Sequence, residues 1–163
     1  MKKLLILFTV SALFLSCVTT RDTDYVIEDI AWSTIDLLQE YEGYTLAVYD
    51  FNSEDDDDAE LIRYIRQVLT TEIANAASYE EVELGVLSRQ NIEQLMKEQA
   101  FQLSDVSDQE TQVEFGRILG ADLIMTGSLT WVDEDVYNLN TQIIEVESGI
   151  VIGGFSEEFY TGE

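Results

Sequence analysis

The sequence contains no histidine, no proline and a single cysteine among its 163 residues. Without these groups it cannot build His/Cys zinc sites, Ser-His-Asp triads, Cys-His dyads or histidine proton shuttles. The lone cysteine also excludes an internal disulfide, and the absence of proline excludes a proline-rich linker between modules. We therefore predict one domain that is not an enzyme and that carries no metal or other cofactor.

Basic residues are also few, eight against 33 acidic ones, which gives a formal net charge of −25 at pH 7. A surface this acidic repels phosphate backbones, so nucleic acid binding is excluded as a function. It is repelled by anionic lipid as well, so a basic patch cannot hold the chain on a membrane. The acidity has two interpretations, a preference for basic or cationic partners and a merely solvated surface, and we predict the solvated surface.

The long apolar run of the chain stands at its start, where Leu4–Leu15 follows Lys2 and Lys3. A charged start, an apolar stretch and a small residue before Cys17 form the layout of a secretory signal peptide. The apolar run is shorter than the roughly 20 residues that a spanning helix needs. We therefore predict that residues 1–16 are a signal peptide that is removed on export.

The residues around this cleavage site resemble a lipobox, the pattern of bacterial lipoproteins in which the cysteine is acylated and becomes the new N-terminus. The match departs from the usual pattern, because Phe14 stands where leucine is usual and Leu15 is larger than the usual small residue. The alternative is an ordinary secreted protein with a stray cysteine. The resemblance implies that Cys17 carries acyl chains such as palmitate, which hold a protein stably on a membrane when there are two or more. Val18, in place of an aspartate, favours the periplasmic face of the outer membrane.

Removal of the signal leaves 147 residues with a net charge of −27, because it takes away two basic residues and no acidic one. A chain of this length forms one well-packed core. Residues 17–25 are predicted to be a short lipidated tether, which spans roughly 25 Å when fully extended. Residues 26–163 are predicted to be the folded domain, held close to the membrane by that tether.

The first half of the domain shows two helical patterns. Apolar residues at helical spacing predict helices over 26–41 and, after an acidic loop, over about 59–77. Short, mostly apolar runs predict strands at 44–51 and 82–87. Trp32 falls far from the apolar stripe of the first helix, so it is a candidate contact for a partner or for lipid headgroups. The alternative is that a second element covers this side chain.

The sequence of the second half of the domain predicts two more helices and three strands. Ser88 is expected to cap a helix that carries Ile92, and Ser107 to Glu110 has the form of a capping box that opens another helix. Gly120 is expected to end that helix. The strands are expected at 122–131, 136–146 and 150–160, with a tight turn between the last two. The whole predicts an α/β fold, a single domain in which helices flank a mixed sheet that ends in an antiparallel meander.

An acidic run at residues 54–58 has two interpretations. The residues before and within it show the spacing of the first calcium-loop ligands, but Asp55 stands in place of the turn glycine and Leu61 in place of the bidentate glutamate. Carboxylates just before a helix also interact favourably with its positive N-terminal end. We predict the second arrangement, and cation binding by this loop stays open.

Five segments carry a resemblance to a known family: LAVYDFNS, LTTEIANA, VELGVLSRQNIEQLMKEQAFQLSDVSD, EFGRILGADLIMTGSLT and YNLNTQIIEVESGIVIGG. Their order, over about residues 44–155, resembles the CsgG-like family of bacterial lipoproteins, the curli production assembly/transport components. Penicillin-binding-protein activators have a related domain. Four residues match the family motifs, and the resemblance implies structural roles for them: Arg89, Gly120, Ala121 and Gly127. Ser88 departs from the family, whose members often have a glutamate before the arginine.

A second departure concerns membrane pores. Pore-forming members insert long amphipathic hairpins whose strands need about 9–11 residues each. The link from Gln99 to Ser107 is too short for such a hairpin, so channel activity is not carried over. The resemblance then implies a lipid-anchored module that docks on or regulates a cell-envelope assembly through protein partners. The alternative is a ring-forming homo-oligomer within an outer-membrane secretion apparatus.

Overall fold

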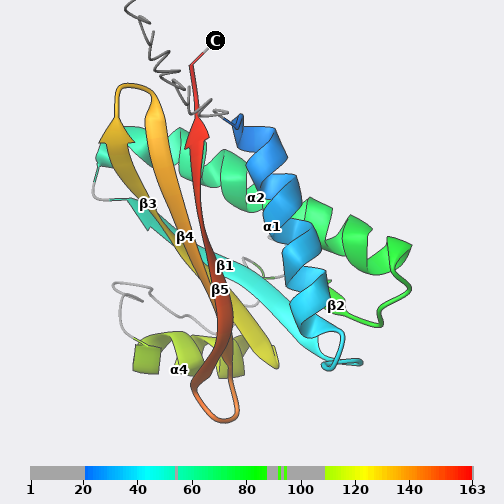
Figure 1. Ribbon diagram of the computed structural model, residues 1–163. Helices are drawn as coiled ribbons and strands as arrows, with labels where there is room; N and C mark the ends of the chain where they lie inside the picture. Colours follow the sequence, from blue (N-terminus) through cyan, green and yellow to red (C-terminus); the bar gives the residue numbers. More distant parts are fainter. Residues whose placement is uncertain (1–20, 54, 88–91, 93, 95–108, 163) are drawn as a thin grey trace, which may run out of the picture.

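The structure is a computed structural model of the chain, and it describes residues 21–53, 55–87, 92, 94 and 109–162 (Figure 1). The helices among these residues are α1 (Thr23–Leu38), α2 (Ala59–Tyr79), α4 (Gln109–Leu119) and a short 3-10 turn before α2 (Asp56–Asp58). The strands are β1 (Thr45–Ser53), β2 (Gly85–Leu87), β3 (Leu123–Asp133), β4 (Val136–Glu145) and β5 (Ile150–Tyr160).

The described strands form one sheet in the order β2-β1-β3-β4-β5. β1 runs parallel to both β2 and β3, whereas β3, β4 and β5 are antiparallel to one another. The predicted α/β fold, with a mixed sheet and a C-terminal antiparallel meander in a single domain, is therefore confirmed.

Hydrophobic side chains pack on both faces of this sheet. Successive residues of a strand point to opposite faces, and Ile143 and Ile144 accordingly belong to two separate buried clusters. The larger cluster lies between the sheet and helices α1 and α2. The smaller one lies on the other face, where Phe115 of α4 is fully buried. Each face is thus closed by helices with an apolar stripe, as the helical spacing predicts.

Helix α1 begins earlier than predicted because of a capping aspartate. The side chain of Asp22 accepts a hydrogen bond from the Tyr25 backbone N–H at 2.9 Å, which satisfies one of the free donors of the first turn. The helix therefore begins at Thr23 and includes the last residues of the predicted tether. It ends at Leu38, so Tyr41 lies beyond it.

Strand β2 is shorter than predicted because the end of α2 uses the residues before it. Glu81 has a positive φ of 57°, and the Val82 N–H donates to the Ala77 carbonyl at 2.9 Å. This is a Schellman motif, formed here with glutamate in the left-handed position that glycine usually takes. Val82 is consequently part of the helix cap, and β2 starts at Gly85.

Helix α4 ends in the same motif with the usual glycine. Gly120 has a φ of 65° and donates to the Arg117 carbonyl, while the Ala121 N–H donates to the Gly116 carbonyl at 3.0 Å. The glycine thus ends the helix and turns the chain directly into β3. None of the helices in the described part of the chain has the length and hydrophobicity required to cross a bilayer.

Candidate docking surface

The first described residue, Arg21, lies at one end of the sheet together with the β3–β4 turn and the end of β5. The Tyr160 N–H donates to the Arg21 carbonyl at 2.8 Å, and the Thr161 N–H donates to the Asp135 carbonyl at 2.9 Å. We call this end the proximal end, because it is the nearest to Cys17 along the chain. Figure 1 shows α4 and the β4–β5 turn at the opposite end of the sheet, which we call the distal end.

The proximal end exposes several large hydrophobic side chains. Trp131 is 63% exposed, Val132 is 46% exposed, and Tyr25 and Tyr64 are also exposed. Trp131 is exposed because of the register of the sheet, in which β1 pairs with β3 only as far as Leu129. The last residues of β3 therefore extend beyond β1 and have a neighbouring strand only on the β4 side.

Carboxylates surround these aromatic side chains. The exposed acidic residues at this end are Asp22, Asp24, Asp55, Asp57, Asp133, Glu134 and Asp135. Two arginines lie nearby, and both are paired: Arg21 contacts Asp29 at 3.1 Å and Glu157 at 3.2 Å, and Arg63 pairs with Glu60. Arg21 also lies over the Tyr25 ring, 5.5 Å from its centroid. The proximal end therefore combines exposed aromatic rings with an excess of negative charge.

One carboxylate at this end is buried and holds two elements together. Asp58 accepts a hydrogen bond from the Ser53 hydroxyl at 2.6 Å and another from the Tyr137 hydroxyl at 2.9 Å. The hydrogen bond to Asp58 raises the pKa of Tyr137 above its ordinary value of about 10, and burial adds to the shift. The pKa of Tyr64 is raised in the same way, first by its hydrogen bond to Asp24. Asp58 thus joins the start of α2 to β1 and β4 at the base of the exposed overhang.

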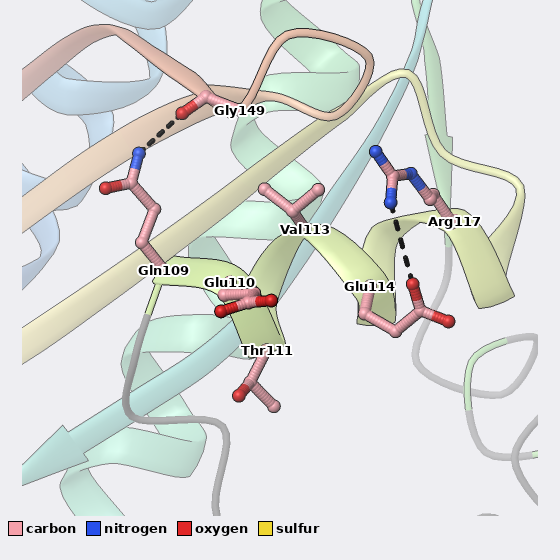
Figure 2. Close-up of a pocket in the computed structure, with 7 residues that line it drawn as sticks. All are labelled: Gln109, Glu110, Thr111, Val113, Glu114, Arg117 and Gly149. Atoms are coloured by element: carbon pink, nitrogen blue, oxygen red, sulfur yellow. Dashed lines mark hydrogen bonds and ion pairs between the residues drawn. The ribbon is translucent and has the colours of Figure 1, made fainter.

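A hollow of about 920 Å³ lies at the distal end, between α4 and the β4–β5 turn (Figure 2). The Gln109 side chain donates to the Gly149 carbonyl at 2.5 Å across one side of it, and Arg117 pairs with Glu114 at 3.6 Å on the other. The Gln109 hydrogen bond ties the start of α4 to the turn, whereas the pair of Arg117 and Glu114 lies within α4.

The three described residues that match the family motifs occupy two places in the fold. Gly120 and Ala121 line a smaller hollow of about 340 Å³ where α4 meets β3, and Ala121 is buried there. Gly127 lies in the middle of β3, where a Cβ atom would come within 2.6 Å of the Phe51 ring. Arg89, like the predicted lipidation residue Cys17, lies outside the described residues.

The structure places Trp32 against a second helix. Its ring lies edge-on to Tyr79 of α2, with 5.4 Å between the ring centroids, and the side chain is half-buried. Tyr79 itself is 77% exposed. A second element thus covers one side of Trp32, as one of the two sequence interpretations held, and the more exposed tryptophan of the chain is Trp131.

Sequence reasoning did not single out Trp131, although a signal was present. The residue precedes Val132 and the acidic turn Asp133–Asp135, and a large aromatic side chain beside a charged turn has little chance of complete burial. The described part of the acidic run, residues 55–58, lies at this same end, where Asp58 accepts a hydrogen bond from Tyr137. Among the described residues no group of three or more acidic side chains has the geometry to hold a metal ion.

Comparison with known proteins agrees with this architecture, a small α/β domain in which helices cover both faces of a mixed sheet. The family described as curli production assembly/transport component CsgG matches residues 43–153, which is more than half of the chain. The protein therefore belongs to the CsgG family.

Solved structures show the same fold. The C-terminal domain of LpoB from Salmonella enterica is 14% identical, with a TM-score of 0.63, and the match covers 83% of this chain and 96% of that one. The same domain from Escherichia coli is also 14% identical, with a TM-score of 0.62 and a coverage of 84% and 100%. No curated protein sequence matches the chain. At this identity the structural likeness concerns the fold alone.

Proposed function

We propose that this protein is a lipid-anchored binding module on the periplasmic face of the outer membrane, where it docks on or regulates a cell-envelope assembly. Family membership supports the envelope location, and the signal and lipobox-like residues before Cys17 support export and anchoring. The proposal assigns no catalysis to the chain, in line with the absence of histidine from its sequence.

The observation that carries the proposal is the position of the proximal end. Four residue steps separate Cys17 from Arg21, and an extended chain covers at most about 14 Å in four steps. A lipidated Cys17 would therefore hold the proximal end near the membrane surface. Since that end exposes Trp131, the anchored protein would present an aromatic surface to partners that lie in or on the same membrane.

Two measurements on the full chain test this proposal. Labelled palmitate should be incorporated into the wild-type protein and not into Cys17→Ala, and Cys17→Ala should keep its fold while it leaves the membrane fraction. Trp131→Phe serves as the control that keeps the anchor. A Cys17→Ala protein that stays membrane-bound after signal cleavage would contradict the lipid anchor.

Crosslinking in cells, followed by mass spectrometry, tests the docking role. The expected result is recovery of an envelope protein with the wild-type chain and a loss of that partner with Cys17→Ala. Crosslinks that join only copies of this chain would favour the ring-forming alternative and overturn the docking proposal. Turnover of cell-wall fragments that survives rigorous purification would overturn the statement that the chain is not an enzyme.

A further inference from the structure

We infer that the Trp131 surface docks a basic segment of a partner protein, rich in arginine and lysine and close to the membrane. We define this surface as Trp131, Val132 and the acidic turn Asp133–Asp135. The inference rests on the proposed function, since it names the chemistry of the partner at the end that the anchor would hold near the membrane.

The exposed ring of Trp131 is suited to bind a cation. A guanidinium or ammonium group over the face of a tryptophan is attracted by the negative face of the ring, and the attraction is stronger when the cation is desolvated. The proximal end already contains such a contact within the chain, between Arg21 and the Tyr25 ring. With 63% of its surface exposed and no strand on one side, Trp131 can accept the same kind of contact from another molecule.

The charges around the ring favour the same partner. Asp133, Glu134 and Asp135 are exposed and follow directly on Val132. The Asp133 side chain accepts a hydrogen bond from the Glu134 N–H at 2.8 Å, which orients the Asp133 carboxylate. Both arginines of this end are engaged by Asp29, Glu157 and Glu60. The negative potential at Trp131 is therefore available to steer and hold a basic segment.

Two other occupants fit the surface less well. A lipid surface favours tryptophan at its headgroups, but the acidic turn lies at the tip of the same hairpin and would meet the headgroups together with Trp131. Anionic headgroups repel that turn. A second copy of the chain without its signal peptide would bring a net charge of −27 against the same charge, which opposes close association. A basic protein segment is the occupant that both the ring and the carboxylates attract.

The chain has two tryptophans, which allows a direct test by fluorescence. In the lipidated Trp32→Phe protein, purified in nonionic detergent, Trp131 is the sole tryptophan and reports on its own surface. Titration with octa-arginine should change the Trp131 emission, and octa-glutamate should not. Raising NaCl from about 0.05 to 0.5 M should weaken the binding about 10-fold or more, because salt screens exposed charges.

Two triple variants in this Trp32→Phe background provide the matched control, because each removes three negative charges. Asp133→Asn/Glu134→Gln/Asp135→Asn changes the proximal turn and should weaken octa-arginine binding about 10-fold or more. Glu83→Gln/Glu110→Gln/Glu147→Gln changes exposed residues elsewhere and should change the binding less than about 2-fold. Circular dichroism should show the same fold for both triple variants.

Several results would overturn the inference. Equal losses in the two triple variants would mean that only net charge matters. An emission change on adding vesicles of phosphatidylethanolamine and phosphatidylglycerol, with none on adding octa-arginine, would assign the surface to lipid. No change with either probe would leave the ring without a cationic ligand and would contradict the inference. Membrane fractionation of Cys17→Ala tests the lipid anchor, whereas the fluorescence titration tests the Trp131 surface. A failure of the proposed function is therefore distinguishable from a failure of this inference.

Discussion

The proximal and distal ends of the domain expose apolar side chains to nearly the same extent, yet in different settings. Trp131 at the proximal end is 63% exposed and Ile150 at the distal end is 61% exposed. Trp131 stands on a strand overhang among carboxylates, within reach of the predicted anchor. Ile150 follows a tight turn beside the buried residues under α4. Exposure alone therefore does not distinguish the two ends. The proposed docking surface is distinguished by its exposed carboxylates and by the hydrogen bond that brings Arg21 to the same end.

The largest expected change in the free energy of unfolding comes from a buried side chain at the distal end. An exposed side chain at the proximal end provides the comparison. Phe115 is fully buried, and its ring lies 4.3 Å from that of Tyr49. Phe115→Ala should therefore lower the free energy of unfolding by about 3–5 kcal/mol. Trp131→Ala should change it by less than about 0.5 kcal/mol, because the side chain is mostly in solvent. Urea unfolding measures both values, and a comparable loss in Trp131→Ala would contradict the view that Trp131 serves binding.

The next largest loss of stability is expected from a substitution in β3, a strand that runs between the two ends. Gly127→Ala places a methyl group within 2.6 Å of the Phe51 ring, and such overpacking lowers stability by about 1–3 kcal/mol. Phe51→Leu in the same chain should recover part of the loss, because the flat ring is the obstacle. A double-mutant cycle gives the coupling, and purely additive effects would show that the close approach of the ring is not the cause.

A smaller change in stability is expected at the proximal end, and it depends on pH. The pKa of Tyr137 is raised in the fold, so the contribution of its protonated hydroxyl is complete below pH 10 and is lost as the pH rises through the folded pKa. Wild-type stability should therefore fall as the pH rises above about 10, and Tyr137→Phe should flatten that fall. Tyr64→Phe, which removes the other raised phenol at this end, is the matched comparison. An identical alkaline profile in all three proteins would contradict the role of the Asp58 hydrogen bond.

The smallest effects compare two residues with positive φ, one at each end. Gly120→Ala should lower stability by about 1 kcal/mol, since alanine is strained in the left-handed conformation even where space is free. Asp135 adopts a φ of 59° at the proximal end, and Asp135→Gly should leave stability unchanged or raise it by up to about 1 kcal/mol. Thermal unfolding of the two variants checks both signs, and a stabilising Gly120→Ala would be inconsistent with the helix end described above.

Most of the fold could be predicted from the sequence because its signals are local. Apolar residues at helical spacing predicted α1 and α2, and Gly120 marked the end of α4. The start of α1 was predicted too late because the apolar stripe begins at Val26, whereas the helix begins with the Asp22 cap. The length of β2 could not be predicted, since nothing in the sequence distinguishes Glu81 as a residue with positive φ.

The candidate docking surface depends on features that the sequence does not contain. The exposure of Trp131 results from β1 stopping at Ser53 while β3 continues, and that register is a property of the assembled sheet. The partial cover on Trp32 likewise depends on where α2 brings Tyr79. Arg21 lies at the same end as the Trp131 surface because the Tyr160 N–H donates to the Arg21 carbonyl and the Thr161 N–H donates to the Asp135 carbonyl.

The most direct test of the central claim is site-specific photocrosslinking in cells, with p-benzoylphenylalanine at position 131 in one protein and at position 150 in the other. The two positions are matched in exposure and lie at opposite ends. We predict that position 131 captures an envelope protein through a segment rich in arginine and lysine, and that position 150 does not. Capture from position 150 alone would contradict the assignment of docking to the proximal end.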